Sequence, residues 1–291
     1  MKLFVFGLGY SGRYIAERHL ANGRSASGTV RSRDKAEALS RSGLTARVFS
    51  PDESDSDIES DLQAAEALLI SAPPAADGDP VLTAFAQHIA AAPNLRWIGY
   101  LSTVGVYGHH DGAWVDEDTP VNPGNARSHY RANAEQAWLA FGAANDVAVH
   151  VFRLAGIYGP GQNQLVQLAK GTSRRVIKPG QVFNRIHVED IARAVDASMD
   201  RPRAGRIYNV TDNEPAPPQD VVTFAASLCG CEPPREVDVE NAGLTEMGRS
   251  FYAENKRVRN LRLREELGVT LAYPTYREGL AALRAAGDGP N

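Results

Sequence analysis

The chain has 291 residues, 43% of them hydrophobic and 23% charged, which is the composition of a globular protein large enough for a full core. Its net charge of −4 gives no general attraction to nucleic acid or anionic membranes, and no apolar run approaches the roughly 18 residues of a membrane span. Cys229 and Cys231 are too few for a zinc site and too close for easy disulfide pairing, so we expect a cytoplasmic protein without a bound metal.

Up to residue 155, short apolar runs alternate with helical segments. The predicted strands are 2–6, 25–30, 45–49, 66–71, 95–103 and 147–154. The predicted helices are 11–23, 34–43, 80–93 and 127–144. An acidic stretch at 50–62 is predicted to be a solvated loop. Apolar strands that alternate with helices indicate a parallel sheet with helices on both faces, so we expect an α/β fold, a Rossmann-like doubly wound sheet.

The regularity ends after residue 155, where Gly156, Gly159 and Gly161 fall in an irregular segment. A strand end runs into a helix at 185–199, and 205–212 resembles another strand. Proline-rich loops and short helices fill the remaining C-terminal part. This change of pattern predicts a small lobe beside the carboxyl edge of the sheet, where such sheets bind ligands.

These patterns together predict two domains. The predicted Rossmann domain consists of residues 1–155 with about 183–212. The predicted substrate-binding lobe consists of about 156–182 with 213–291.

Three glycines follow the first strand with the spacing G-x-G-x-x-G, at Gly7, Gly9 and Gly12, and a helix opens directly after them. Strand, glycine loop and helix in this order form the dinucleotide-binding fingerprint. Gly7 would allow the tight turn, Gly9 the approach of a pyrophosphate, and Gly12 close packing of the helix. We expect the loop, with Tyr10 and Ser11, to bind a cofactor; the alternative is a purely structural turn.

The end of the second strand indicates which cofactor. An NAD site usually has Asp or Glu there, to bind the ribose 2′-hydroxyl. This chain has Arg31, Ser32 and Arg33 instead. Guanidinium and hydroxyl groups match a 2′-phosphate, so NADP is predicted and NAD is less favoured. The alternative is a basic loop that is merely solvated, and this alternative fits Arg33 better than Arg31.

Five motifs in order make the chain resemble an extended or atypical short-chain dehydrogenase/reductase of the NAD-dependent epimerase/dehydratase family. The motifs are GLGYSG at 7–12, YLSTVGVYG at 100–108, FRLAGIYGPG at 152–161, RIHVEDIARAV at 185–195, and the tail NKRVRNLRLREELG with YPTYREGL. The resemblance covers nearly the whole chain. It implies a small-molecule substrate such as a nucleotide sugar or another carbonyl or hydroxyl compound. Many members dimerise through the helix corresponding to 127–144, so the resemblance also implies a homodimer.

In this family, a Ser or Thr after the fifth strand and a Tyr-x-x-x-Lys motif on the next helix carry the chemistry. Ser102 and Thr103 match the first element, and Tyr107 matches a loop tyrosine near the substrate. A structural role is the alternative for all three.

The second element is degraded. Aligning Ala134 and the glutamate after it with the family's Ala-Glu pair puts Arg127 at the tyrosine position and Arg131 at the lysine position. The other register puts Tyr130 at the tyrosine position, but Ala134 then takes the place of lysine. We prefer the first register. Arg131 could hold the cofactor ribose, Arg127 suits an anionic substrate group better than proton transfer, and Tyr130 remains a candidate proton donor.

The resemblance adds further candidates. Residues that would line the cofactor are Ser71, Ala72 and Pro73, and residues that would border the substrate are Arg153, Tyr158 and His187. The sequence thus predicts an NADP-dependent epimerase/dehydratase-like or reductase-like enzyme for a small, nucleotide-sugar or anionic substrate. The alternative is a catalytically inactive sensor of NADP(H) with the same fold.

Overall fold

The computed structural model describes residues 1–290, which form two compact units. Unit 1 comprises Met1–Thr103, His129–Arg153 and Ile191–Tyr208. Unit 2 comprises Val104–Ser128, Leu154–Asp190 and Asn209–Asn291. Residues 104–128, 154–155, 183–190 and 209–212 therefore belong to unit 2, whereas the sequence patterns assign them to the Rossmann domain.

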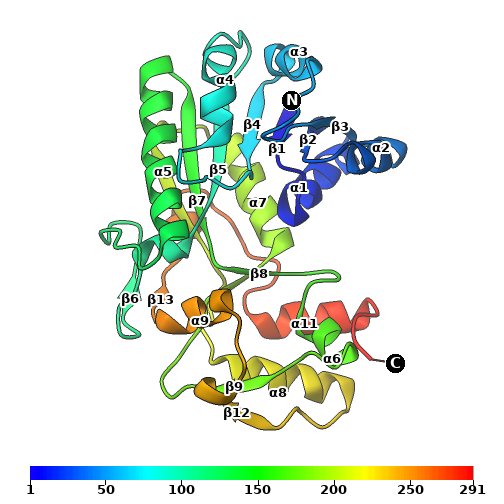
Figure 1. The fold of residues 1–291 in the computed structure, drawn as a ribbon, viewed down its shortest axis with the longest axis vertical. Helices are drawn as coiled ribbons and strands as arrows, with labels where there is room; N and C mark the ends of the chain where they lie inside the picture. Colours follow the sequence, from blue (N-terminus) through cyan, green and yellow to red (C-terminus); the bar gives the residue numbers. More distant parts are fainter. Residues whose placement is uncertain (291) are drawn as a thin grey trace. The chain divides into compact units, whose positions relative to one another are not determined.

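A seven-stranded sheet forms the centre of unit 1 (Figure 1). Its strands are β1 (Lys2–Phe6), β2 (Ser25–Val30), β3 (Thr45–Val48), β4 (Ala67–Ile70), β5 (Trp97–Thr103), β7 (Ala148–Leu154) and β11 (Arg206–Val210). They lie in the order β11-β7-β5-β4-β1-β2-β3, and the pairs along β3-β2-β1-β4-β5 are parallel. This order confirms the predicted Rossmann-like sheet.

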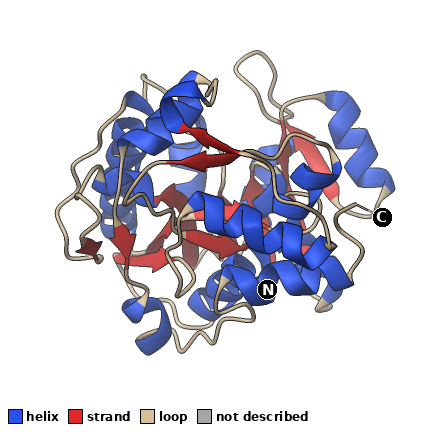
Figure 2. Cartoon of the chain, turned by 90° about the horizontal axis from the view of Figure 1, so that it is seen from below, coloured by secondary structure: helices blue, strands red, loops and turns tan. Residues whose placement is uncertain are grey.

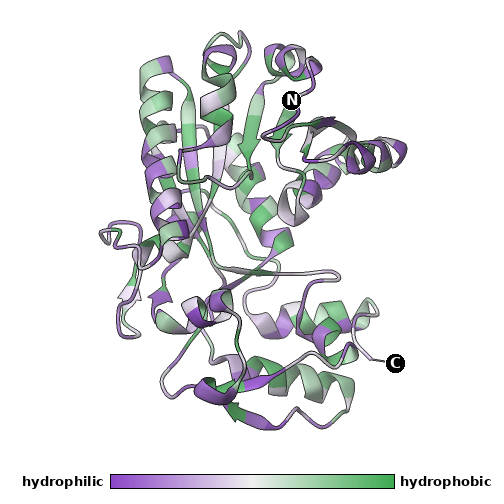
Figure 3. Ribbon diagram, in the orientation of Figure 1, coloured by the Kyte–Doolittle hydropathy of each residue, from purple (hydrophilic) through white to green (hydrophobic). Residues whose placement is uncertain are grey.

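Helices cover both faces of this sheet (Figures 1 and 2). They are α1 (Tyr10–Ala21), α2 (Arg33–Arg41), α3 (Asp57–Ala64), α4 (Pro80–Ala90), α5 (Ala126–Asn145) and α7 (Val188–Met199). Phe85 of α4 and Trp138 of α5 pack with Phe4 and Phe6 in one hydrophobic cluster. Because side chains alternate along a strand, Val5 points to the opposite face, where α1 packs. Figure 3 shows that the strands are largely hydrophobic, whereas the outer surfaces of helices such as α2 are polar.

Helix α3 begins inside the acidic stretch 50–62 that we expected to be a loop, and for residues 57–62 that expectation was wrong. Ile58 and Leu62 are four residues apart, face the same side of the helix and are both fully buried in the core. Asp57 and Glu59 stand in the first turn, where the helix dipole favours negative charge. The acidic composition concealed a short amphipathic helix.

Unit 2 contains short strands, helices and 3-10 turns. Its strands are β6 (Trp114–Val115), β8 (Gly156–Tyr158), β9 (Arg175–Ile177), β10 (Arg185–His187), β12 (Glu236–Asp238) and β13 (Arg257–Val258), paired as β10-β8, β12-β9 and β13-β6. Its helical segments are η1 (Val104–Tyr107), α6 (Gln164–Ala169), α8 (Pro218–Cys229), η2 (Val239–Asn241), α9 (Glu246–Ala253), α10 (Leu261–Glu265) and α11 (Tyr276–Ala285). Residues from α6, α8 and α11 form its hydrophobic core.

No helix within residues 1–290 is long and apolar enough to cross a membrane. Nor do those residues bring three or more His, Cys, Asp or Glu side chains together as a metal site would require.

Candidate functional site

The loop between β1 and α1 uses each of its three glycines differently. Gly7 has φ +98°, which favours glycine, and a Cβ there would lie 3.0 Å from the backbone nitrogen of Ala72. A Cβ on Gly12 would lie 2.3 Å from the carbonyl oxygen of Gly7, so α1 approaches the loop this closely only with glycine there. A Cβ on Gly9 would meet no atom within 4 Å. The backbone at Gly9 therefore borders open space that a phosphate group could enter.

Helix α1 begins at this loop with its positive end. The first hydrogen bond of the helix runs from the N–H of Arg13 to the carbonyl of Gly9, at 2.9 Å. The N–H groups of Tyr10, Ser11 and Gly12 come before it and take no part in the i→i−4 hydrogen bonds of the helix. The first turn contains no acidic residue. Backbone N–H groups and the helix dipole together favour an anion at such a terminus. Tyr10 and Ser11 stand in this first turn, and their contact with a pyrophosphate stays a prediction.

The segment after β4 lies against the same loop. The N–H groups of Ser71 and Ala72 both donate to the carbonyl of Phe6, at 2.8 and 2.9 Å, which ties the ends of β4 and β1 together. Pro73, the next residue, is exposed. Ser71 and Ala72, two of the three residues predicted to line the cofactor, therefore lie against the glycine loop.

The basic residues after β2 divide into two environments. Arg33 pairs with Glu53 and, at 3.2 Å, with Asp55, so acidic side chains already neutralise its guanidinium. Arg31 is exposed and forms no ion pair or hydrogen bond within residues 1–290. The Ser32 side chain makes no capping hydrogen bond to α2. Of the two guanidiniums, only that of Arg31 is available to an added phosphate.

Ser102 belongs to a buried polar cluster at the end of β5. Its hydroxyl donates to Glu135 Oε1 at 2.5 Å. Arg153 of β7 donates to Glu135 Oε2 from Nη2 at 2.8 Å, and from Nε to both carboxylate oxygens at 3.2 Å. Glu135 and Arg153 are 1% and 3% exposed. Arg153, which we expected beside the substrate, is instead engaged in a buried ion pair, and the Ser102 hydroxyl is occupied by the same carboxylate.

Thr103 and Tyr107 differ in exposure. Thr103 is half-buried at the end of β5. Tyr107 is fully buried, and its hydroxyl donates to Asn209 Oδ1 at 2.8 Å within unit 2. In this structure Tyr107 therefore has no surface to offer a substrate, whereas Thr103 does.

Helix α5 carries the three residues of the degraded motif. Arg131 Nη1 donates to the carbonyl of Leu101 at 2.5 Å and lies 3.4 Å from the hydroxyl of Tyr100. Tyr130 is half-buried and Arg127 exposed, and neither side chain has a hydrogen bond or ion pair in the described chain. Arg131 is thus fixed against β5, while Arg127 and Tyr130 keep their polar groups available.

Tyr158 and His187 of unit 2 pack in its interior. A Cβ on Gly279 would lie 2.0 Å from the Tyr158 hydroxyl, which shows how tightly α11 covers this side chain. His187 Nδ1 accepts the N–H of Glu189 at 3.1 Å, and the Tyr158 and Tyr273 rings pack against the imidazole. Burial lowers the pKa of His187 to about 4. Both residues are less than a tenth exposed, so neither presents a surface to the substrate that we expected them to border.

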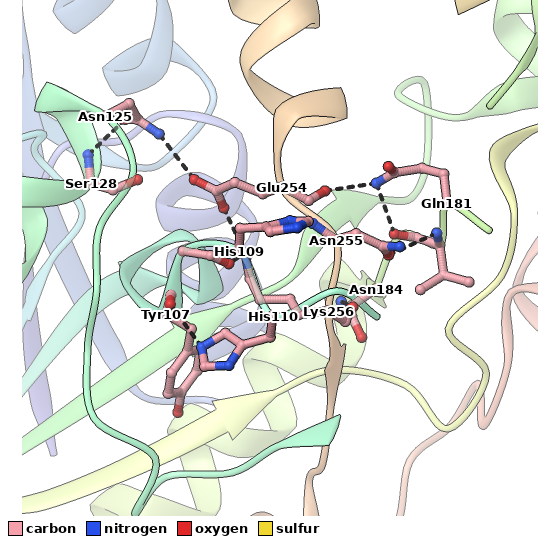
Figure 4. A network of polar contacts seen from close by, with 12 residues as sticks. Tyr107, His109, His110, Asn125, Ser128, Gln181, Asn184, Glu254, Asn255 and Lys256 are labelled. Carbon is pink, nitrogen blue, oxygen red and sulfur yellow. Dashed lines mark hydrogen bonds and ion pairs between the residues drawn. The ribbon is translucent and has the colours of Figure 1, made fainter. Parts of the chain in front are cut away.

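A polar network in unit 2 fixes the start of α5 (Figure 4). Asn125 Oδ1 accepts the N–H of Ser128 at 3.0 Å, and its amide donates to Glu254 at 3.3 Å. Lys256 Nζ donates to Glu254 at 2.6 Å and to the carbonyl of Gly108 at 2.7 Å. Burial lowers the pKa of Lys256, and the Glu254 carboxylate opposes that shift. The contact of Asn125 with Glu254 and that of Lys256 with Gly108 are not visible in the sequence, because these partners are 129 and 148 positions apart.

Residues 81–211, from α4 to the end of β11, match the model of the NAD dependent epimerase/dehydratase family. Protein YeeZ of Escherichia coli (strain K12) is 28% identical over 284 residues, which cover 94% of this chain and 96% of that protein. A conserved protein of unknown function from Silicibacter pomeroyi has a solved structure with 51% identity, a TM-score of 0.88 and 99% coverage of both chains.

The dTDP-glucose 4,6-dehydratase of Bacillus anthracis, solved in complex with NAD, shares the fold. It is 18% identical, with a TM-score of 0.78 and coverage of 99% of this chain and 97% of that chain. The family model and the shared fold agree with the motifs that the sequence presents. Over residues 81–211 the chain therefore resembles the NAD-dependent epimerase/dehydratase family.

Proposed function

We propose that unit 1 binds a nicotinamide dinucleotide at the glycine loop. The observation that carries this proposal is the open backbone at Gly9 beside the N-terminus of α1, whose first turn contains no acidic residue. A pyrophosphate placed there would meet N–H groups and the positive end of the helix. The segment from Ser71 to Pro73 would line the same cofactor. The Bacillus anthracis dehydratase was solved with NAD bound, which supports this class of ligand.

We further propose that the preferred cofactor is NADP, because within the described residues the guanidinium of Arg31 has no partner and that of Arg33 has two. Replacing Arg31 with alanine should weaken NADPH binding about tenfold and leave NADH binding unchanged, since only NADPH carries the 2′-phosphate. Isothermal titration with NADPH, NADP, NADH and NAD measures this preference.

Arg33→Ala is the matched control, because its guanidinium is already neutralised by Glu53 and Asp55. It should change the affinity for NADPH by less than about threefold. Equal affinity of the wild-type chain for NADPH and NADH, or an unchanged preference in Arg31→Ala, would overturn the phosphate assignment.

The chain acts, in this proposal, as an epimerase/dehydratase-like or reductase-like enzyme on a small nucleotide-sugar or other anionic substrate. The name of the Bacillus anthracis relative identifies a nucleotide sugar as that enzyme's substrate. A bound nicotinamide would supply hydride transfer. Arg127, whose guanidinium has no partner among residues 1–290, would bind an anionic substrate group, and the remainder of unit 2 would supply the substrate lobe.

Tyr130 and Thr103 are the residues we propose for proton transfer and for orienting the substrate oxygen. Replacing Tyr130 with phenylalanine should lower kcat about 100-fold with a smaller change in KM, because a general acid or base contributes mainly in the transition state. The assay is NADPH oxidation with a panel of carbonyl compounds and nucleotide sugars.

Tyr107→Phe makes the same chemical change at a buried tyrosine. Loss of its hydrogen bond to Asn209 should destabilise the fold by about 1 kcal/mol and leave kcat within about threefold of the wild-type value. Full activity in Tyr130→Phe would exclude Tyr130 as the proton donor.

An inactive NADP(H) sensor is the second candidate function. It is favoured by Arg127 and Arg131, which stand at the family's tyrosine and lysine positions in the preferred register. An arginine is a poor general acid because its pKa is above about 12. Tight binding of NADPH without turnover across the whole substrate panel would favour the sensor over the enzyme.

A further inference from the structure

One residue of β2, Thr29, accepts two successive backbone N–H groups of the glycine loop. The N–H of Gly7 donates to Thr29 Oγ1 at 3.0 Å, and the N–H of Leu8 donates to the Thr29 carbonyl at 2.7 Å. Thr29 is 2% exposed and Leu8 1%, whereas the contact with the N–H of Gly7 is partly buried. A strand residue thus holds the turn through its side chain as well as its backbone.

The side-chain contact matters because of the conformation of Gly7. Its φ of +98° turns the chain sharply out of β1. A partly buried N–H that lacks an acceptor at such a turn would favour other loop conformations. A β-branched threonine has restricted χ1 freedom, so its hydroxyl is held in place before any ligand arrives. On the other side, Ser71 and Ala72 donate to the carbonyl of Phe6, so neighbouring strands restrain the turn from both sides.

We propose that Thr29 is a positioning residue for the cofactor loop. By holding the N–H of Gly7, its hydroxyl sets the turn that leaves Gly9 open and directs the N-terminus of α1 toward the pyrophosphate of a dinucleotide. Thr29 acts through the loop and does not itself touch the cofactor. This inference rests on the proposed binding of NADP at that loop.

Thr29→Val tests the hydroxyl at nearly constant side-chain volume. We expect the Kd for NADPH to rise about tenfold, because part of the binding energy is then needed to order the loop. Thr29→Ser keeps the acceptor and should stay within about twofold of the wild-type Kd. Hydrogen exchange of the peptide containing Gly7, measured without cofactor, should be faster in Thr29→Val and nearly unchanged in Thr29→Ser.

Ser27→Ala is the matched control on the same strand. Its hydroxyl is buried and has no partner in the described chain, so its removal should alter neither Kd nor exchange. If Thr29→Val does not fold, Thr29→Ala compared with Thr29→Ser isolates the hydroxyl instead.

The outcomes separate the two proposals. A wild-type chain that binds no dinucleotide would overturn the proposed function, whereas the exchange measurement would still report whether Thr29 orders the loop. A wild-type chain that binds NADPH, with equal Kd values and equal exchange in Thr29→Val, would overturn the role of Thr29 alone. Equal losses in Thr29→Ser and Thr29→Ala would assign the effect to the lost methyl group and also reject it.

Discussion

Replacing Gly9 with valine should lower the affinity for NADPH at least about 100-fold while leaving the fold intact. The backbone at Gly9 has φ −76° and ψ −161°, which a residue with a side chain can adopt, and a Cβ there meets no protein atom within 4 Å. The added side chain would fill the space that we assign to the pyrophosphate. Isothermal titration measures the affinity, and urea unfolding should show a free energy within about 0.5 kcal/mol of the wild-type value.

Gly12→Ala is the informative comparison within the same loop. Its Cβ would lie 2.3 Å from the carbonyl oxygen of Gly7, so the loop or α1 must shift. We expect this variant to lose both stability and affinity, by about 1–3 kcal/mol in unfolding free energy. Wild-type affinity for NADPH in Gly9→Val would show that no phosphate group approaches Gly9.

The glycine loop and the sheet were predictable because their signals are local. Apolar runs of four to seven residues identify strands in any parallel sheet, and the spacing of Gly7, Gly9 and Gly12 encodes a turn within six residues. Helix α3 was missed for the opposite reason. Its apolar signal is only Ile58 and Leu62, set among carboxylates, so composition outweighed periodicity.

The surroundings of the predicted catalytic residues could not be read from the sequence. Glu135 helped to align the degraded motif, yet its contacts with Ser102 and Arg153 join a helix to two strands. Such pairs depend on tertiary packing, which no local pattern encodes. A motif match placed Arg153 and His187 near a substrate, but only the structure shows that both are buried.

The short strands of unit 2 were also unpredictable, because their pairing depends on tertiary packing. β6 and β13 are two residues long and pair across about 140 positions of the chain, with Arg257 opposite Trp114. Segments of this length show no alternation of polar and apolar side chains.

Replacing Glu135 with alanine should cause the largest loss of stability among these variants. The change would leave the guanidinium of Arg153, 3% exposed, without its carboxylate, and the hydroxyl of Ser102 without its acceptor. Removing one partner of a buried ion pair costs about 3–5 kcal/mol, since the remaining charge stays desolvated. Urea unfolding should therefore show a much lower midpoint with an unchanged m-value.

Two further variants locate the origin of that loss. Glu135→Gln keeps an oxygen acceptor for Ser102 but removes the negative charge. Its unfolding free energy should therefore lie between those of Glu135→Ala and the wild-type chain. Pairing Glu135→Leu with Arg153→Leu removes both charges and should recover part of the stability, because buried ion pairs are often replaced by apolar residues at little cost. A wild-type midpoint in Glu135→Ala would mean that Arg153 is hydrated or finds another acceptor, and that the carboxylate does not hold the end of β5 in place.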